Sequence, residues 1–178
     1  LANSQTVTAL EDVETSITLT GDDGDADATQ ALTFILASLP STGSLSETSG
    51  GAAITSGQLP LTLSDAEIFF TTATNDVSQQ TFDFRVQDDG GTANGGDDTA
   101  TLSVASTVTV NAVNDQPTLT ATPDNPTFTE GGAAAGLFSA TSVSTIESGQ
   151  TITGFTMTVT NVNDGANEIL NIDGSPNT

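Results

Sequence analysis

The sequence contains no cysteine, histidine, tyrosine or tryptophan, and its single basic residue is Arg85, so lysine is absent as well. Without cysteine, the chain cannot form disulfides, iron–sulfur clusters or thiolate zinc sites. Without histidine, it cannot use Ser-His-Asp or Cys-His catalysis. Without lysine, it cannot form a Schiff base or a lysine isopeptide cross-link. These absences favour a non-enzymatic protein whose core is built from phenylalanine and aliphatic side chains.

Negative charge dominates the sequence, because 23 aspartate and glutamate residues give a net charge of −22. Nucleic acids and anionic membranes are poor partners for such a chain, since their phosphates would be repelled. No apolar run reaches the roughly 18 residues of a membrane-spanning helix, so we expect no direct membrane insertion. Divalent cations are the natural complement of this charge. No signal peptide is visible and the chain starts at Leu1, so we expect it to be part of a longer protein.

Alternation of apolar and polar residues, rich in threonine and valine, predicts β-strands almost throughout the chain. Amphipathic helices are absent, although residues 64–67 could form one short turn. The candidate core aromatics are Phe34, Phe82, Phe84 and one of the pair Phe69 and Phe70. In the first part we expect strands near residues 6–9, 15–20, 32–37, 43–47, 67–73, 80–87 and 99–112. In the second part we expect strands near residues 127–129, 137–143, 151–160 and 168–172.

The segment Asn-Asp-Gln-Pro at residues 114–117 ends the first set of strands and marks a domain boundary. Seven short strands separated by glycine-rich turns fit an antiparallel β-sandwich. We therefore predict one β-sandwich over residues 1–116 and part of a second over residues 117–178. About four strands in the second domain would leave its sheet edges unpaired.

Acidic residues concentrate in two glycine-rich loops of the first domain. Residues 21–27 contain Asp22, Asp23, Asp25 and Asp27, and residues 88–98 contain four more aspartates. If the strands alternate in direction, both loops lie at one end of the sandwich, and Glu11, Asn114 and Asp115 lie at the other. Calcium prefers six to eight oxygen ligands in flexible geometry, which such loops supply better than the tight octahedron of Mg²⁺. Aspartate and glycine are also ordinary turn residues, so solvated loop charge remains the alternative for Asp22, Asp97 and Asp98.

Five segments together resemble the cadherin-like tandem repeats of large secreted bacterial adhesins of the RTX type. The segments are Glu-Asp at 11–12, Asp-Asp-Gly-Asp-Ala-Asp at 22–27, the stretch 32–45, Phe-Asp-Phe-Arg-Val-Gln-Asp-Asp-Gly-Gly at 82–91, and Val-Asn-Ala-Val-Asn-Asp-Gln-Pro at 110–117. The resemblance covers residues 5–117, and residues 118–178 look like the start of a diverged second repeat. It implies an all-β fold of tandem antiparallel Ig/cadherin-like β-sandwiches, of which the second is incomplete.

The resemblance also implies calcium ligands at matching positions. Glu11 matches the acidic ligand after the first strand, and Asn114 and Asp115 match the linker ligands. Asp25 and Asp27 match an Asp-x-Asp motif and Asp88 an aspartate after the sixth strand, with Asp23 a further candidate in the same loop. In the second repeat, Glu130 matches Glu11. The region 144–149 offers only Glu147, so a calcium site there would be poorer in ligands.

These observations favour a calcium-rigidified structural repeat of a secreted or cell-surface adhesin, which acts as a spacer or cell-adhesion module. Its partners would be neighbouring repeats of the same chain. An alternative is the subunit of an extracellular filament or sheath, assembled by strand exchange between copies. A carbohydrate-binding or hydrolytic module is the third hypothesis. It is less favoured because no tryptophan or tyrosine is available to stack on a sugar ring.

Overall fold

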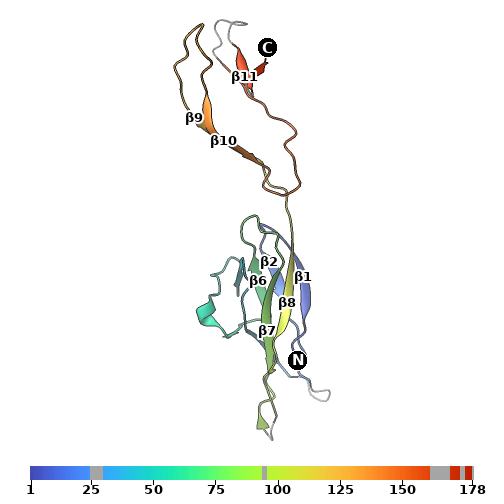
Figure 1. Cartoon of the computed structure of the whole chain (residues 1–178). Coiled ribbons are helices and arrows are strands. Elements are labelled where there is room, and N and C mark those ends of the chain that lie inside the picture. The colour runs from blue at the N-terminus through green and yellow to red at the C-terminus, as the bar shows by residue number, and fades with distance from the viewer. Residues whose placement is uncertain (25–29, 94–95, 161–168, 173–174, 178) are drawn as a thin grey trace. The chain divides into compact units, whose positions relative to one another are not determined.

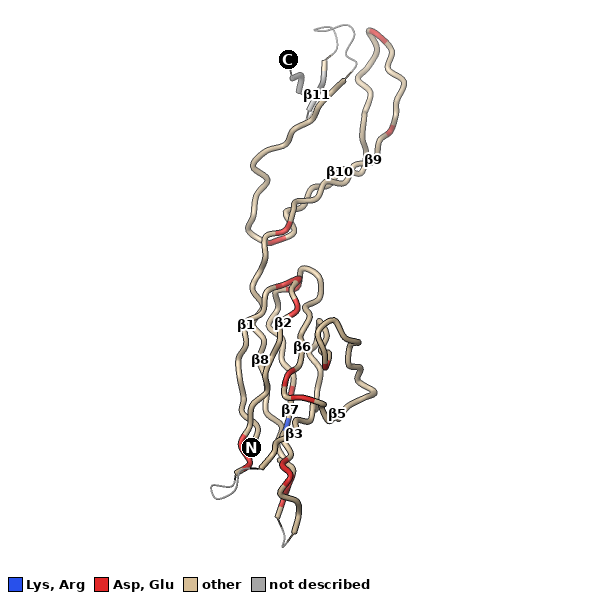
Figure 2. Tube along the Cα trace, turned by 180° about the vertical axis from the view of Figure 1, so that it is seen from behind, with Lys and Arg blue, Asp and Glu red and all other residues tan. Residues whose placement is uncertain are grey.

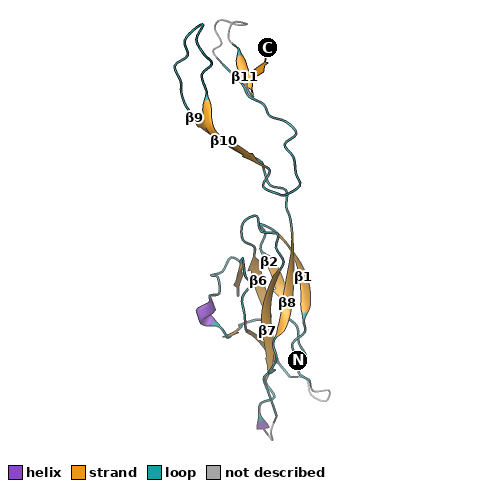
Figure 3. Cartoon of the chain, viewed as in Figure 1, coloured by secondary structure: helices purple, strands orange, loops and turns teal. Residues whose placement is uncertain are grey.

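The computed structural model describes residues 1–24, 30–93, 96–160, 169–172 and 175–177. It is built almost wholly from β-strands and loops (Figure 3), which confirms the predicted all-β class. Helical structure in the described ranges is limited to short 3₁₀ turns such as η1 (Ser56–Gln58). Within these ranges, no helix has the length and apolar character needed to cross a lipid bilayer. The chain divides into two units, Leu1–Gln116 and Pro117–Thr178.

The first unit contains two β-sheets that share one hydrophobic core (Figure 1). The five-stranded sheet has the order β1 (Gln5–Leu10), β8 (Val104–Asn111), β7 (Gln80–Asp88), β3 (Leu32–Leu36) and β5 (Leu61–Thr62). The three-stranded sheet has the order β2 (Thr15–Thr18), β6 (Glu67–Thr71) and β4 (Ser44–Ser46). The predicted strands of this unit are thus all present, and the two-residue strand β5 is an addition.

One strand pair departs from the expected antiparallel arrangement. The first strand β1 runs parallel to the last strand β8, with a register from Gln5 opposite Ser106 to Leu10 opposite Asn111. The other pairs in both sheets of this unit are antiparallel. Because the two terminal strands point the same way, the chain enters β1 at one end of the unit and leaves β8 at the opposite end.

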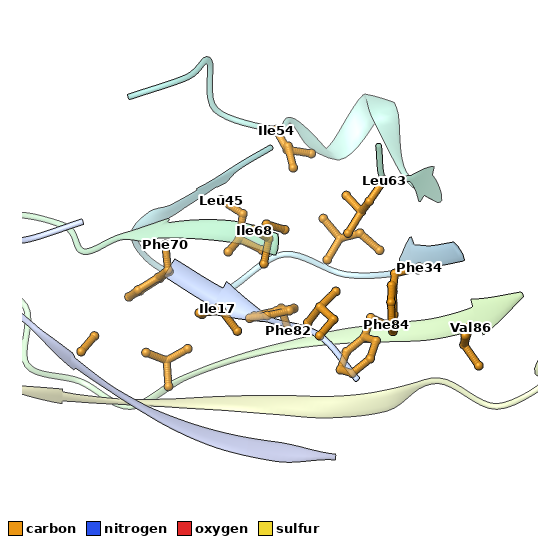
Figure 4. Packing of buried hydrophobic residues seen from close by; sticks show 14 of the residues in the cluster. Ile17, Phe34, Leu45, Ile54, Leu63, Ile68, Phe70, Phe82, Phe84 and Val86 are labelled. Carbon is orange, nitrogen blue, oxygen red and sulfur yellow. The ribbon is translucent and has the colours of Figure 1, made fainter. Parts of the chain in front are cut away.

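The core follows directly from the period-two alternation of the strands. On β7, the side chains of Phe82, Phe84 and Val86 point inward, while Asp83 and Arg85 lie on the other face. The inward-facing side chains pack against aliphatic and aromatic side chains from the second sheet, including Ile17 and Phe70 (Figure 4). The ring of Phe84 lies 6.1 Å from that of Phe34 and 6.5 Å from that of Phe82, in tilted orientations typical of aromatic pairs. Of the two candidates on β6, Phe70 is the fully buried one.

Two local predictions for this unit were wrong. The short helical turn lies at residues 56–58 rather than 64–67, because the Gln58 side chain reaches back to accept a hydrogen bond of 2.7 Å from the Thr55 backbone N–H. The last strand begins at Val104 rather than near residue 99. Residues 99–103 contribute only an isolated bridge, between Thr99 and Gln87.

The second unit contains two separate two-stranded sheets among its described residues. One pairs β9 (Thr118–Pro123) with β10 (Phe138–Ser144), and the other pairs β11 (Leu170–Ile172) with β12 (Ser175–Asn177). The predicted strands at 137–143 and 168–172 therefore appear, whereas those at 127–129 and 151–160 do not. The latter segments have the right alternation, but within the part of the chain that the structure describes no strand pairs with them, and an isolated strand is not stable in water.

Candidate metal centres

Acidic residues are concentrated at both ends of the first unit, as the coloured Cα trace in Figure 2 shows. At one end, Asp88 closes β7 opposite Leu32, the first residue of β3. At the other end, Glu11 follows β1, and its backbone N–H donates to the carbonyl of Asn111 at 3.0 Å. We call the first set the N-terminal pole; it consists of Asp22, Asp23, Asp88, Asp89, Asp97 and Asp98. We call the second set the C-terminal pole; it consists of Glu11, Asn114 and Asp115.

Glu11 is the best-positioned acidic residue of the C-terminal pole. Its side chain is only 1 % exposed, although glutamate is seldom fully buried unless it is paired. One carboxylate oxygen accepts a hydrogen bond of 2.8 Å from the backbone N–H of Val113. This bond ties the end of β1 to the segment that follows β8. The fold therefore holds a buried carboxylate at the point where the chain leaves the unit.

Asp115 brings a second carboxylate to the same place. An oxygen of Asp115 lies within 4.8 Å of an oxygen of Glu11. Asn114 is adjacent, and its amide nitrogen donates to the Asp115 carbonyl at 3.4 Å. These residues offer two carboxylates, an amide oxygen and a backbone carbonyl, which are the donor types that Ca²⁺ takes. The carboxylate pair could hold a metal ion.

The electrostatics of this pair favour a bound cation. Two negative charges within 4.8 Å of each other repel by roughly 3 kcal/mol at an effective dielectric constant near 20. Arg85 is the only basic side chain of the protein, and it lies within β7 opposite Ile35 rather than in the segments that follow β1 and β8. A divalent ion between the two carboxylates would replace this repulsion by attraction.

The N-terminal pole surrounds a pocket of about 260 Å³. Asp23, Asp88, Asp97 and Asp98 line it, together with neighbouring residues such as Thr99. The structure therefore brings two of the predicted ligands, Asp23 and Asp88, into one pocket. Asp97 and Asp98, for which loop charge was the alternative, share that pocket. Asp97 and Asp98 were not among the predicted ligands, although the Asp-Asp pair at the end of the glycine-rich loop was a sequence signal for them.

Several carboxylates of the N-terminal pole also organise their own loops. An oxygen of Asp22 accepts from the Gly24 N–H at 2.7 Å, and one of Asp88 accepts from the Gly90 N–H at 2.9 Å, as in ordinary Asx turns. Asp89 accepts from the Ala31 N–H at 2.8 Å and so connects the two acidic loops. An ionised carboxylate has about four acceptor sites. Loop formation and metal coordination are therefore compatible at this pole.

The remaining predicted ligands lie elsewhere. Asp25 and Asp27 lie outside the described residues. Glu130 and Glu147 belong to the second unit. Glu130 is exposed in the loop between β9 and β10, and Glu147 follows β10 in a turn in which its N–H donates to the Thr145 carbonyl at 2.9 Å.

Two further acidic residues hold loops in place by accepting hydrogen bonds from them. Glu14 accepts hydrogen bonds from the Ser49 hydroxyl at 2.6 Å and from the Gly50 N–H at 2.9 Å, and these bonds lower the pKa of its carboxyl group. Hydrogen bonds from Ser78, and one from Thr42, likewise lower the pKa of Asp76. Both carboxylates are committed to holding loops of the first unit, which their sequence context did not reveal.

Comparisons with known proteins do not add a family to this description. No protein-family model matches the chain, and neither a curated protein nor a solved structure matches it. The functional interpretation therefore depends on the residues themselves.

Proposed function

We propose that this chain is a calcium-rigidified structural repeat of an extracellular or cell-surface adhesin, which acts as a non-enzymatic spacer or cell-adhesion module. The observation that carries the proposal is the buried Glu11 carboxylate with Asp115 within 4.8 Å of it, in a chain with one basic side chain. The finer assignment, to Ig/cadherin-like sandwiches of the RTX type, is supported by the sequence resemblance and belongs to the same proposal.

Calcium fits the donor set better than other common metals do. Zinc and iron sites use histidine or cysteine in most proteins, and this chain has neither. Magnesium demands near-ideal octahedral geometry and retains several waters. The C-terminal pole instead offers several protein oxygens, from the Glu11 side chain after β1 and from Asn114 and Asp115 after β8, and calcium accepts such a set in flexible geometry.

The mechanical role follows from where Glu11 and Asp115 lie in the first unit. Glu11 is fixed to the end of β1, and Asp115 lies four residues after the end of β8. An ion bound by both would fasten the outgoing segment to the sheet and restrict its backbone. A spacer needs such stiffening, because a flexible exit would let successive parts of the chain fold back on one another.

Isothermal titration of the full chain with Ca²⁺, after treatment with a chelator, tests the proposal. We expect saturable binding, at least about tenfold weaker binding of Mg²⁺, and a melting temperature that falls when calcium is removed. At a calcium concentration a hundred times Kd, the stabilisation is about 2.7 kcal/mol. For a unit of this size that corresponds to a shift of roughly 10 °C. A chain that releases no binding heat and melts identically with calcium and with chelator would rule the proposal out.

A further inference from the structure

Glu11 and Asp12 begin the short connection between the two sheets of the first unit. β1 ends at Leu10 and β2 begins at Thr15, so the chain crosses from the five-stranded to the three-stranded sheet within four residues. Asp12 has a left-handed backbone (φ 59°), which is uncommon for a residue other than glycine. The conformation of this turn determines where the buried Glu11 carboxylate lies in the C-terminal pole.

A hydrogen bond from the second sheet holds the turn. The Asp12 backbone N–H donates to the hydroxyl oxygen of Thr72 at 3.0 Å, although the two residues are 60 positions apart in the sequence. Thr72 directly follows β6, and Phe70 of β6 pairs with Thr15 at the start of β2. The end of β6 therefore runs alongside the turn, which is fastened to the three-stranded sheet as well as to β1.

The loop that follows Thr72 is itself held in place. The Asp76 N–H donates to the Ala73 carbonyl at 3.1 Å, and the Asp76 carboxylate accepts from the Ser78 N–H at 2.8 Å and from the Thr42 hydroxyl. These bonds hold the chain on one side of Thr72, and the pairing of β6 holds it on the other side. Thr72 therefore presents its hydroxyl from a fixed position.

We propose that Thr72 is a positioning residue for calcium, whose hydroxyl holds the turn so that the Glu11 carboxylate stays near Asp115. This inference rests on the calcium site proposed above. Glu11 itself bonds to the Asn111 carbonyl through its N–H and to the Val113 N–H through its carboxylate. Both bonds lead to β8 or to the segment after it, which also carries Asp115. The Thr72 bond instead ties the turn to the other sheet, which stays in place when that segment moves.

This anchor matters because the two carboxylates repel each other before an ion binds. The repulsion between Glu11 and Asp115 favours conformations in which the turn and the outgoing segment separate. The apparent Kd for calcium rises in proportion as the fraction of molecules with both carboxylates in place falls. Loss of a hydrogen bond that shifts this equilibrium about three- to tenfold therefore raises the Kd by up to the same factor.

Calcium titration of the full chain with Thr72→Val, Thr72→Ser or Thr71→Val tests the assignment. Valine keeps the shape of threonine without its hydroxyl, whereas serine keeps the hydroxyl. Thr71 is the matched control, because it is the exposed neighbour on β6 and its hydroxyl makes no hydrogen bond within the described part of the chain. We expect a Kd about three- to tenfold higher for Thr72→Val, and within about twofold of the unmodified chain for the other two variants. A Thr72→Val chain that melts lower in chelator but keeps the original Kd would reveal a purely structural role and overturn the inference.

Amide hydrogen exchange in chelator separates this inference from the calcium site itself. The Val113 N–H donates to the Glu11 carboxylate at 2.8 Å, so its exchange rate reports whether that side chain is in place. Relative to a core amide such as that of Phe84, we expect Val113 to exchange about three- to tenfold faster in Thr72→Val and at an unchanged rate in Thr71→Val. If the unmodified chain binds no calcium, the proposed function fails while this measurement still tests the anchor. Equal Val113 exchange in the two valine variants would refute the role of Thr72.

Discussion

Replacing Glu11 by glutamine should change stability in opposite directions with and without calcium. Without calcium, the variant loses the repulsion from Asp115, roughly 3 kcal/mol, which solvent screening at the partly buried Asp115 reduces to about half. Glutamine still accepts from the Val113 N–H, but this neutral bond is weaker by about 0.5–1 kcal/mol. The net effect is a gain of about 1 kcal/mol, or an increase of about 4 °C in melting temperature in chelator.

In saturating calcium the same variant lacks one charged ligand. We expect its calcium-induced shift to fall from roughly 10 °C to under about 3 °C, so that it melts below the unmodified chain. Scanning calorimetry of the full chain, with chelator and with calcium, measures both shifts.

Asp12→Asn is the matched control for this experiment. Asp12 is the exposed neighbour of Glu11 and has a left-handed backbone (φ 59°) that asparagine tolerates equally well. The Asp12→Asn variant should melt within about 1 °C of the unmodified chain, both in chelator and in calcium. If Glu11→Gln retains the full calcium shift, or behaves like Asp12→Asn in chelator, the role assigned to the Glu11–Asp115 pair is wrong.

Three further predictions concern the first unit. Because hydrogen bonds from Ser49 and Gly50 hold the Glu14 pKa below its ordinary value of 4.5, this carboxylate stabilises the fold at neutral pH, and its contribution is lost as pH falls through the lowered pKa. Urea unfolding of Glu14→Gln should therefore show a shallower loss of stability below about pH 5, and parallel pH profiles would contradict this. Phe84→Ala should lower the free energy of unfolding by about 3–5 kcal/mol, since the ring is fully buried, and denaturant unfolding measures this loss. A loss below about 1 kcal/mol would be inconsistent with the core described above. Gly43→Ala should lower the free energy of unfolding by about 2 kcal/mol, because Gly43 has φ 74° and an added Cβ would lie 2.5 Å from the Thr71 carbonyl oxygen. Gly57→Ala, where an added Cβ would meet no atom within 4 Å, should leave the free energy of unfolding nearly unchanged.

The regular strands could be predicted from the sequence because their alternation coincides with a shared core. Phe82, Phe84 and Val86 recur at every second position, and this periodicity identified β7 and its inward face. The strand β5 was missed because Leu61 and Thr62 are too few residues to show a period. The turn at 56–58 carried a Thr-x-x-Gln signal at Thr55–Gln58 that was overlooked in favour of residues 64–67.

The site was predictable in its residue types and less so in its contacts. Glu11 and Asp115 are 104 positions apart in sequence, and only the parallel pairing of β1 with β8 brings the segments that carry them together. The roles of Glu14 and Asp76 depend on loops whose course has no periodic signal. In the segment 151–160 the alternation predicted a strand that the structure does not contain, because a strand forms only where a second strand pairs with it.

The parallel pairing of β1 and β8 also determines how the first unit bears tension. Because the chain enters β1 at one end and leaves β8 at the other, a pulling force on both ends slides these neighbouring strands past each other. All the backbone hydrogen bonds of six register pairs, from Gln5–Ser106 to Leu10–Asn111, then resist together. Two antiparallel terminal strands pulled from adjacent ends would instead separate one bond at a time. The first unit is therefore organised to transmit load along its strands before it unfolds.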